Sequence, residues 1–520
     1  MPLGKTILIL IILIISSFSG CNFLRQTKFT LISLTIDDDD GFPRMHVQFN
    51  TSDSSTLLLI GPQKNLLFSN TYYYGIHNES IYLSAYRTTT TSGLYTLKAV
   101  DTSKNTIFEN ELLFKGHNIS LISIQEDWWD TSTGSSIVTF HLKVKNSGDL
   151  PAYPYNIYVS QGKNIVNVDL IPIVILPSHS EQIAFFINPV NIFFEGHPLN
   201  LSIFDNTGRV LFKGILDSTQ KDTIDSWIYQ WHYLGSQLLK IPNVDWFYNY
   251  YKNLDRFNII DYSAYVFDPY DNSYIEFLAN QLLSQKNLKT NVEKINYIAS
   301  FVQSIDYKKD NLENETYEYP KYPLETLQEK QGDCEDKAIL MAALLESLGY
   351  NVSLLRLPEH MAVGVHLNET VTGYSYYIDE YYFLESTTLF IPLGKIPQEY
   401  QGISNITIYP ISTRPLLTHS WKNAIRYTIS TGVDYVSITA IIENLGTKAA
   451  SDIEIQGAFY DNTNQVYNQA NIDIASIAVG EKRIVELSID IPSVISVTLR
   501  TQLYLNGTMI DQRESTSVFP

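Results

Sequence analysis

Short runs of alternating hydrophobic and polar residues fill the chain from about residue 27 to residue 220. Gly, Asn, Asp and Ser separate these runs, and no stretch there has the three- and four-residue spacing of a long helix. Alternation with a period of two is typical of strands that bury one face, and many short strands divided by turns indicate sandwich-type domains. We therefore predict two β-rich blocks, over residues 27–115 and 118–217.

One strand pattern occurs twice in the chain. Hydrophobic residues alternate with smaller or polar ones before an Asn-x-Gly turn in both copies, at Val138, Phe140, Leu142 and Val144 and again at Val436, Ile438, Ala440 and Ile442. The next strands also align, Tyr155 and Ile157 with Ile453 and Ile455. The blocks 118–217 and 420–520 are therefore predicted to be two copies of one immunoglobulin-like β-sandwich, which resembles the adhesion-related domains of prokaryotic surfaces. The block 27–115 matches neither copy.

The hydrophobic period changes in the block from 225 to 410. Apolar residues at three- and four-residue spacing predict helices over residues 274–285, 291–304 and 334–348. Thr290 and Glu293 form a capping box before the second helix, and Gly349 ends the third. Strands are predicted to follow over residues 351–357, 360–367 and 374–385, so this block has the pattern of an α+β domain.

The first residues have the pattern of an export signal. Lys5 precedes an apolar run over 6–15, and small residues at 16–20 follow, which is typical of a signal peptide over 1–20. The run is too short for an ordinary membrane-spanning helix. The sequence Phe18-Ser19-Gly20-Cys21 resembles a lipobox, which implies a lipid on Cys21 and a lipid-anchored linker over 21–26. An uncleaved signal anchor and plain secretion are the alternatives. All three predict an extracytoplasmic protein, and a lipid on Cys21 or a signal anchor would hold it in the membrane at the cell surface.

Composition excludes some partners and adds others. The 36 Lys and Arg residues against 55 Asp and Glu residues give a net charge of -19 without a basic run, so nucleic acid is not a predicted partner. With two cysteines in 520 residues the chain has no disulfide framework. Asn-x-Ser/Thr sequons, which suit a glycoprotein, occur at sites that include Asn50, Asn78, Asn118, Asn200 and Asn506. Separately, a glycan is a candidate binding partner of the sandwich domains in a surface interaction protein.

Three motifs in the α+β block carry candidate chemistry. They are Gly332-Asp333-Cys334-Glu335-Asp336-Lys337-Ala338, His360-Met361-Ala362-Val363 and Tyr382-Phe383-Leu384-Glu385-Ser386-Thr387. A Cys at a helix start, a His on the following strand and an acidic residue ending the next strand resemble the transglutaminase-like superfamily, and residues 301–307 and 323–327 are similar to its lead-in helix and loop. The resemblance covers about residues 225–410. It implies an α+β fold class, a papain-like/transglutaminase-like core flanked by all-β sandwich domains.

A thiol at a helix start has opposing influences on its pKa. With an ordinary pKa of about 8.5 it is mostly protonated at neutral pH, and the helix dipole and a neighbouring imidazolium lower that value. The carboxylates of Asp333, Glu335 and Asp336 raise it. We expect Asp333 to cap the helix and the other two carboxylates to bond amides of its first turn. The thiolate of Cys334 is then expected to depend on a histidine.

Two histidines of the predicted second strand are candidates. A hairpin turn at residues 372–373 sets His360 against Glu385 and, farther along the strand, His366 against Asp379. The two pairs lie roughly 20 Å apart along a strand, so only one can serve the cysteine. The resemblance selects His360 with Glu385. We expect His366 and Asp379 to form a surface pair.

The resemblance assigns roles to the three residues. Cys334 attacks an acyl carbon, His360 transfers the proton and Glu385 orients the imidazole. The main-chain amide of Cys334 is one predicted oxyanion donor, with Gln331 and Tyr322 among the candidates for the second. The sequence has no HExxH, CxxC, phosphate-loop or dinucleotide motif, so neither a metal nor a cofactor is assigned. The acidic run at 37–40 lacks the spacing of a calcium loop and is expected to be a solvated turn.

The implied activity is acyl transfer through a thioester. Enzymes of this type act on amide or peptide bonds as cysteine peptidases, deamidases or transamidases, and the acceptor decides the outcome. Because no amine-binding site is evident, we favour hydrolysis of a protein or peptide substrate at the cell surface. The alternative is a non-catalytic binding or adhesion protein that uses the core as a silent scaffold. In that case the protein keeps its full activity when Cys334 is replaced by Ala.

Overall fold

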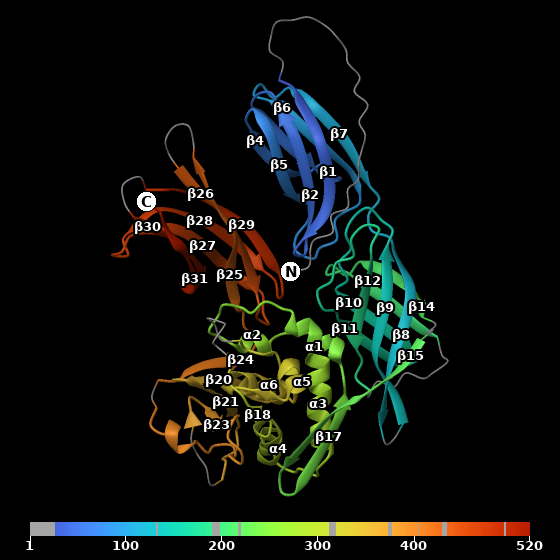
Figure 1. Cartoon of the computed structure of the whole chain (residues 1–520), viewed down its shortest axis with the longest axis vertical. Coiled ribbons are helices and arrows are strands. Elements are labelled where there is room, and N and C mark those ends of the chain that lie inside the picture. Colours follow the sequence, from blue (N-terminus) through green and yellow to red (C-terminus); the bar gives the residue numbers. More distant parts are fainter. Residues whose placement is uncertain are drawn as a thin grey trace, which may run out of the picture. The chain divides into compact units, whose positions relative to one another are not determined.

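The computed structural model describes residues 27–131, 134–189, 198–216, 220–310, 319–372, 377–403, 405–428, 434–492 and 496–519. It consists mostly of β-strands and divides into two compact units, residues 1–224 and 225–520 (Figure 1). The predicted signal peptide, Cys21 and the linker to residue 26 lie outside the described residues. Within the described ranges, no helix is long and apolar enough to cross a membrane.

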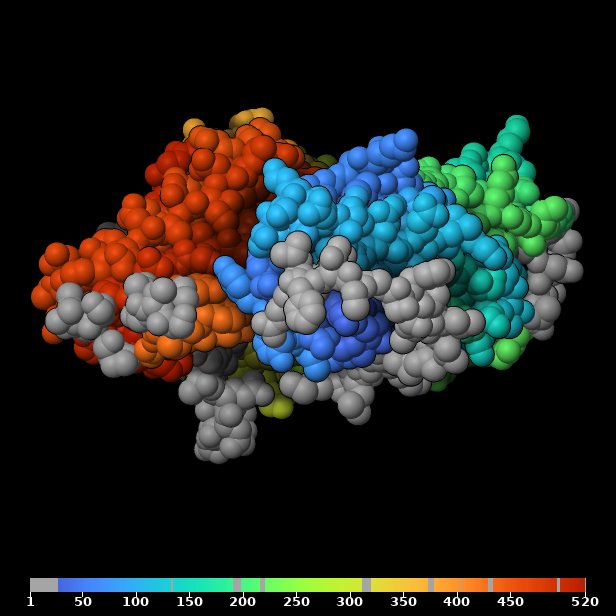
Figure 2. Space-filling model, turned by 90° about the horizontal axis from the view of Figure 1, so that it is seen from above, coloured from blue at the N-terminus to red at the C-terminus, as the bar shows by residue number. Residues whose placement is uncertain are grey.

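The first unit begins with a two-sheet sandwich. One sheet has the strand order β1-β2-β5 and the other β4-β3-β6-β7. The strands are β1 (Phe29–Asp39), β2 (Phe42–Thr51), β3 (Ser55–Ile60), β4 (Leu66–Tyr72), β5 (Gly75–Tyr82), β6 (Gly93–Asp101) and β7 (Thr106–Phe114). Met45 and Phe49 of one sheet share a buried core with Leu57 and Leu97 of the other. The surface of this sandwich is blue to cyan in Figure 2.

A second sandwich completes the first unit. Its sheets have the orders β12-β9-β8-β15 and β11-β10-β13-β14. The strands are β8 (Ile119–Thr131), β9 (Gly134–Asn146), β10 (Asn156–Gln161), β11 (Asn164–Asp169), β12 (Ser180–Phe186), β13 (Leu199–Phe204), β14 (Val210–Leu216) and β15 (Gln220–Ile224). Phe140 and Leu142 of β9 pack against residues of the opposite sheet that include Ile157 and Leu201. The alternating pattern thus buries one face of β9.

The second unit ends with a third sandwich. Its sheets have the orders β25-β26-β29 and β28-β27-β30-β31. The strands are β25 (Leu417–Thr428), β26 (Asp434–Asn444), β27 (Ala450–Tyr460), β28 (Val466–Ile477), β29 (Lys482–Asp490), β30 (Val497–Leu505) and β31 (Thr508–Phe519). Ile438 and Ile442 face Ile455 and Leu503 in its core.

All three sandwiches have the same strand order. When the seven strands of each are numbered from its own N-terminal end, one sheet has the order 1-2-5 and the other 4-3-6-7, and the second sandwich adds β15 beside its first strand. Comparison of the sequence blocks with one another matched only the second and third sandwiches. The first sandwich reaches the same order with different residues, because strand order depends on the hydrophobic period and the connections rather than on residue identity.

In chain order, a hairpin comes before the helices of the second unit, and the strands of a five-stranded sheet come after them. The hairpin is formed by β16 (Ser226–His232) and β17 (Ser236–Pro242), and the helices are α1 (Asp245–Lys252), α2 (Ser263–Val266), α3 (Asn272–Ser284), α4 (Asn291–Gln303), α5 (Pro323–Glu329) and α6 (Cys334–Ser347). The helices predicted at 274–285, 291–304 and 334–348 correspond to α3, α4 and α6. The capping box of Thr290 and Glu293 is confirmed, with both bonds at 3.1 Å. Gly349 follows α6 at a φ of 82°, as a helix C-terminus favours.

Helix α6 forms the centre of this domain. Residues 335–345 are all buried, which suits a helix with apolar residues on every side. It packs against α2, α3, α4 and α5 on some sides and against β20 (Asn351–Leu357) and β21 (His360–His366) on another. Figure 1 shows the other helices around α6 and the sheet beside it. The sheet has the order β22-β23-β21-β20-β24, with β22 (Tyr377–Ile378), β23 (Tyr381–Leu384) and β24 (Thr407–Ile411).

The predicted pairing of the histidine strand was wrong by two residues. Val363 of β21 lies opposite Leu384 of β23, because the tight turn falls at Asp379 and Glu380, between β22 and β23, and not at 372–373. Both turn residues have positive φ, as a two-residue hairpin turn requires. Asp379 therefore lies in the turn. The expected surface pair with His366 was also wrong, since His366 Nδ1 lies 2.9 Å from the main-chain oxygen of Glu380.

The acidic run at 37–40 is not the solvated turn that we expected. Asp37 forms an ion pair with Arg44 at 3.0 Å, and Asp38 accepts a hydrogen bond of 2.7 Å from the hydroxyl of Tyr153. Arg44 also lies 3.0 Å from Asp39. These carboxylates therefore hold β1 to β2 and to the second sandwich within the same unit.

Candidate active site

Cys334 is the first residue of α6, and its side chain is partly buried. The main-chain N–H of Met361 lies near enough to the Cys334 sulfur to favour the thiolate and so lower the pKa of the thiol. Because Met361 is the second residue of β21, the start of the helix and the start of the strand meet at the thiol. His360, the residue that begins the strand, is the chain neighbour of Met361.

His360 and Glu385 form a buried pair. Nε2 of His360 lies 3.1 Å from Oε2 of Glu385, and the two side chains are 5% and 0% exposed. Burial by itself would raise the pKa of Glu385. The bond and the charge of His360 together with two bonds from Thr387 lower this pKa below its ordinary value. An ionised Glu385 fixes the proton of the imidazole on Nε2 and leaves Nδ1 as the nitrogen that can accept a proton from Cys334.

Gln303 and Lys337 join the elements around this pair. Nε2 of Gln303, the last residue of α4, donates to the main-chain oxygens of Glu385 and Ile391 at 2.9 and 2.8 Å. Lys337, one turn into α6, donates from Nζ to the main-chain oxygen of Gln303 at 3.2 Å. Sequence reasoning missed both residues because polar side chains inside a helical period carry no signal of what they bind.

A carboxylate lies directly beside the thiol. The S–H group of Cys334 donates to Oε2 of Glu335 at 3.1 Å. Burial, followed by the charge and hydrogen bond of Glu335 and the charge of Asp333, raises the pKa of the thiol well above its ordinary value, and the Met361 bond opposes this only in part. We expected the helix start and an imidazolium to lower that pKa. The thiol in this structure is therefore protonated, and Glu335 points to it rather than serving as the expected cap of the first turn.

Asp333 is the N-cap of α6, as expected, whereas Asp336 bonds main-chain amides that come before the first turn and not those within it. Asp333 occupies the N-cap position, and its main-chain N–H donates to Oδ2 of Asp336 at 3.3 Å. Oδ1 of Asp336 accepts from the main-chain N–H of Lys321 at 2.8 Å, and the Lys321 ammonium lies 2.9 Å from Oδ2. A Cβ on Gly332 would lie 2.7 Å from the Cβ of Asp336. Glycine at 332 therefore allows this carboxylate to fold back over the helix start.

The two predicted side-chain oxyanion donors occupy different surroundings. Tyr322 is 2% exposed, and its ring lies between those of Tyr251 and Tyr265, with centroids 4.5 and 4.8 Å away. Gln331 lies in the short strand β19 (Gln331–Gly332), just before the helix start. Tyr322 thus has a packing position in an aromatic cluster, whereas Gln331 stays near the cysteine in the chain.

Two other tyrosines are brought to the thiol. Tyr307 of β18 (Asp306–Tyr307) pairs with Gly332, and burial and the charge of Cys334 raise its pKa to about 12. The ring of Tyr400, in the short helix η1 (Gln398–Tyr400), lies parallel to the imidazole of His360 at 4.3 Å. Burial, Glu385, Glu399 and Cys334 raise the pKa of Tyr400. Both hydroxyls stay protonated, so each can donate a hydrogen bond.

Residues 277–355 match the sequence model of the transglutaminase-like superfamily. This segment is a transglutaminase-like domain. The match includes Cys334 and ends before His360 and Glu385, so these two residues are assigned from their motifs and from their own contact at 3.1 Å. A search of curated proteins finds no match.

Several solved structures have weak likeness to the chain. Red sea bream transglutaminase is 10% identical, with 72% of this chain and 79% of that chain covered and a TM-score of 0.18. A proposed protease of Parabacteroides distasonis is 9% identical over 72% and 94% of the two chains, with a TM-score of 0.21. The exo-chitosanase of Amycolatopsis orientalis is 16% identical over 36% and 26%, with a TM-score of 0.15. Because TM-scores this low carry no argument about the fold, the family assignment rests on the sequence match over residues 277–355.

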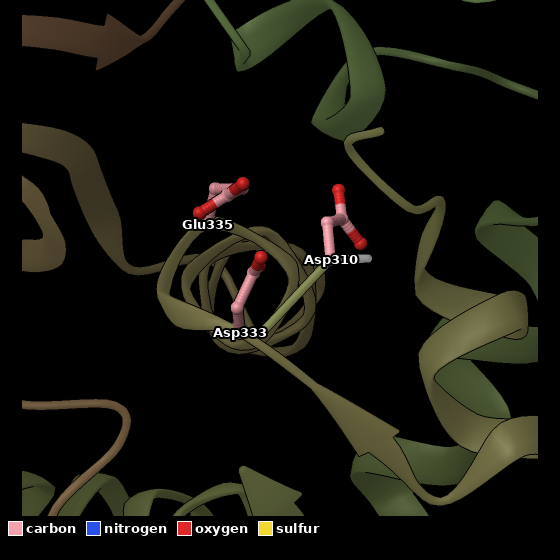
Figure 3. A group of neighbouring side chains, drawn as sticks. All are labelled: Asp310, Asp333 and Glu335. Atoms are coloured by element: carbon pink, nitrogen blue, oxygen red, sulfur yellow. The ribbon is translucent and has the colours of Figure 1, made fainter. Parts of the chain in front are cut away.

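Three carboxylates gather beside the transglutaminase-like cysteine. One oxygen each from Asp310, Asp333 and Glu335 lies within 4.8 Å of the other two (Figure 3). Sequence analysis assigned no metal ligands, and these residues follow none of the ligand spacings that it considered. Folding brings Asp310 to the start of α6, where the other two lie.

Proposed function

We propose that the protein is a transglutaminase-like thiol enzyme that acts on amide or peptide bonds through an acyl-thioester. The observation that carries this proposal is that α6, which begins with Cys334, and β21, which begins with His360, meet at the thiol, while Glu385 holds the imidazole of His360 at 3.1 Å. The superfamily match over residues 277–355 supports it independently.

The first half of the reaction forms the thioester. The thiol of Cys334 gives its proton to Nδ1 of His360 as the sulfur attacks the carbonyl carbon of the substrate. The main-chain amide of Cys334 and the hydroxyl of Tyr307 or Tyr400 donate to the oxygen that becomes negative. The C–N bond then breaks, and the imidazolium gives its proton to the leaving amine.

The second half returns the enzyme to its starting state. Water attacks the thioester carbon and gives a proton to His360, the C–S bond breaks, and the sulfur takes the proton back. An amine in place of water makes a new amide bond. We favour water because it needs no binding site of its own.

The N-terminal pattern supports a location outside the cytoplasm. A signal peptide over residues 1–20 with a lipid on Cys21 would anchor the protein at the cell surface, where its substrates would be surface proteins or peptides. Labelling of intact cells with a reagent that cannot cross the membrane tests this location, and protection of the protein from the reagent would contradict it.

Mass spectrometry of a peptide mixture incubated with the protein tests the activity. We expect new chain ends if peptide bonds are cleaved, or side-chain amides converted to acids if glutamine or asparagine is attacked. Cys334→Ala and His360→Ala should lose this conversion. His366→Ala is the matched control, because His366 lies on the same strand and its Nδ1 lies 2.9 Å from the main-chain oxygen of Glu380 instead of a carboxylate. Conversion that survives in Cys334→Ala would contradict the proposal.

A second function is favoured by the bond between the thiol and Glu335. This bond holds the thiol protonated, as expected of a binding protein whose core is a silent scaffold. Glu335→Gln distinguishes the two functions in the same peptide assay. An enzyme whose resting thiol is restrained should convert peptides at least as fast in this variant, whereas a silent core leaves the mixture unchanged in both proteins.

A further inference from the structure

We propose that a cavity between helix α4, the β16–β17 hairpin and the loop that follows Glu385 binds a large apolar residue of a peptide. Its volume is about 460 Å³, and sites for small ligands have volumes of roughly 300–1,000 Å³. The lining consists of residues 232–234 at the hairpin turn, residues 390–392 of the loop, and Asn296, Ser300 and Gln303 of α4. None of these residues is the nucleophile or the base, so the site goes beyond the proposed activity.

The hairpin side of the cavity is fixed on α4. The indole Nε1 of Trp231 donates to Oγ of Ser300 at 3.1 Å, and the ring of Tyr233 meets that of Tyr297 edge-on, with centroids 5.3 Å apart. Nζ of Lys286 donates to the main-chain oxygen of Tyr233 at 2.9 Å. Figure 1 shows the hairpin beside α4. This wall of the cavity is therefore held in place by the protein itself.

The loop side is held by two amide side chains of the same helix. Oδ1 of Asn296 accepts from the main-chain N–H of Leu393 at 2.8 Å, and Oε1 of Gln303 accepts from that of Phe390 at 3.1 Å. Nε2 of Gln303 donates to the main-chain oxygen of Ile391 at 2.8 Å. Because Asn296 and Gln303 lie two turns apart, they share one face of α4. The loop is thus fixed at both of its ends, which lowers the cost of ordering it around a ligand.

Two apolar residues line the cavity in a strained backbone conformation. Leu234 has a φ of 48° and Phe390 a φ of 63°, and the two residues are 87% and 66% exposed. In the part of the chain that the structure describes, they are the only residues with apolar side chains and positive φ. Bulky side chains disfavour this left-handed region, and their exposure to water adds a second cost. Such strain gathers at ligand sites, and an apolar group in the cavity would cover both side chains.

The polar groups of the lining indicate what else the ligand carries. Oγ of Ser300 accepts from Trp231 and donates to the main-chain oxygen of Tyr297, and both ends of the Gln303 amide are bonded. Since Oδ1 of Asn296 accepts from the loop, Nδ2 is the donor end of this amide, and it has no partner among the described residues. The ligand is therefore expected to present an oxygen acceptor to Asn296.

The lining fits a neutral ligand better than a charged one. Among the described residues it contains no Asp, Glu, Lys or Arg, and its one imidazole, on His232, is exposed to solvent. A charge inside the cavity would be left without a partner, which is costly. A residue within a peptide meets these conditions, because its carbonyl oxygen is neutral and lies close to its side chain.

One side chain joins this cavity to the candidate active site. Besides its bonds to the loop, Gln303 donates from Nε2 to the main-chain oxygen of Glu385 at 2.9 Å, and Glu385 holds the imidazole of His360. A peptide residue in the cavity would therefore lie one side chain away from Glu385. We expect the substrates of the proposed enzyme to carry a large apolar residue, and this expectation alone rests on the proposed function.

Titration of N-acetyl-phenylalaninamide into the full-length Cys334→Ala protein, followed by saturation-transfer NMR of the ligand, tests the proposal. We expect saturable binding, and N-acetyl-alaninamide should bind at least about tenfold more weakly because it lacks a large apolar side chain. Asn296→Asp should weaken binding at least about fivefold, since it keeps the bond to the loop but replaces the donor by a carboxylate. Phe390→Gly, which keeps the left-handed backbone, should weaken binding by a similar factor. Leu389→Ser is the matched control, because Leu389 is exposed beside Phe390 and does not line the cavity.

Three results would overturn the site. One is the absence of saturable binding, and another is equal binding by Asn296→Asp and Phe390→Gly, which would place the peptide residue elsewhere. The third is tighter binding of phenylpropionate than of N-acetyl-phenylalaninamide, which would show that the cavity takes an anion. Thermal unfolding checks that each variant is folded, and Leu234→Asn replaces Phe390→Gly if that variant is not, because Asn tolerates the left-handed backbone.

The absence of the nucleophile from the tested protein separates this site from the proposed activity. Binding of the probe without any conversion of peptides by the wild type would contradict the proposed function alone. Conversion of peptides by the wild type without binding of the probe would contradict the cavity site alone.

Discussion

Two neighbours act on Cys334 in opposite directions. Glu335 accepts the hydrogen of the thiol at 3.1 Å and, with burial, raises the thiol pKa. His360, whose Nε2 is held by Glu385, offers Nδ1 as the place to which the proton can move. The reactivity of the thiol therefore depends on whether the carboxylate or the imidazole faces it.

We predict that Glu335→Gln increases the rate at which iodoacetamide alkylates Cys334 at pH 7. The variant removes a negative charge that raises the thiol pKa, and each unit by which the pKa falls gives about ten times more thiolate. The rise should be at least about tenfold by that relation. Glu359→Gln is the control, because Glu359 is an exposed carboxylate next to His360 in the chain. An equal rate in wild type and Glu335→Gln would show that Glu335 does not restrain the thiol.

Lys337 gives a prediction about stability and pH. Its Nζ is buried and donates to the main-chain oxygens of Gln303 and Ile305, and burial lowers its pKa to about 8. The unfolded chain, with a lysine pKa of about 10.4, binds more protons between these two values. The free energy of unfolding therefore rises with pH between about 8 and 10, by roughly 1–3 kcal/mol. When the pH is lowered from about 10 through the folded pKa of about 8, this gain in the free energy of unfolding is lost.

Urea unfolding of wild type and Lys337→Met at pH 8 and pH 10 measures this effect. The difference in unfolding free energy, wild type minus variant, should grow in favour of the wild type as the pH rises. The difference removes the contribution of groups that titrate in both proteins. A difference that does not change with pH would contradict the lowered pKa of Lys337.

The sequence could predict part of the candidate site. Cys334, His360 and Glu385 were found from their motifs, and the structure brings the last two into contact. The role of Glu335 was not predictable, because its side chain can turn either to the helix amides or to the thiol. Asp310 was not predictable either, because its position beside α6 depends on the fold of the segment between them.

Among the elements, long periodic helices were predictable and short ones were not. Helices α3, α4 and α6 have enough turns for a three- and four-residue period to appear. Helices α1, α2 and α5 are short, and the hairpin of β16 and β17 has aromatic residues that suit either class of element. The turn at 379–380 was not predicted because Asp379 and Glu380 take positive φ although neither is a glycine, the residue that usually indicates such a turn.

The sheet beside α6 gives a prediction at Gly364 of β21. A Cβ at this position would lie 2.5 Å from Oγ of Ser353 and 2.8 Å from the Cβ of Tyr381. We expect Gly364→Ala to lower the free energy of unfolding by about 1–3 kcal/mol, as overpacking does. Thermal or urea unfolding measures the loss. Adding Ser353→Ala removes the nearest atom and should recover part of it, whereas a Gly364→Ala variant as stable as the wild type would contradict the packing described here.

At the scale of the whole molecule, two sandwiches share a buried asparagine. Asn146 and Asn444 are both 0% exposed, and each is the last residue of the second strand of its sandwich. Each Nδ2 donates to two main-chain oxygens, Leu150 and Ile175 in one sandwich and Lys448 and Ile477 in the other. The repeated Asn-x-Gly turn seen in the sequence thus has a structural reason, because this side chain ties the turn to a neighbouring loop.

We predict that Asn146→Ala and Asn444→Ala destabilise different units. Each leaves buried main-chain oxygens without donors, which costs about 2–4 kcal/mol when two bonds are lost. The two residues lie in the units 1–224 and 225–520. In scanning calorimetry each variant should lower the transition of its own unit and leave that of the other unchanged. Variants that shift one common transition by the same amount would show that the units unfold together.

The most direct test of the central claim compares four proteins in a chelator-containing buffer at pH 7: wild type, Glu335→Gln, His360→Ala and the double variant. The measured quantity is the rate of Cys334 alkylation by iodoacetamide, followed by mass spectrometry. If Cys334 and His360 act as one site, the gain produced by Glu335→Gln should disappear when His360→Ala is added. If the gain is the same with and without His360, or if Cys334 is inert in all four proteins, the thiol site proposed here is contradicted.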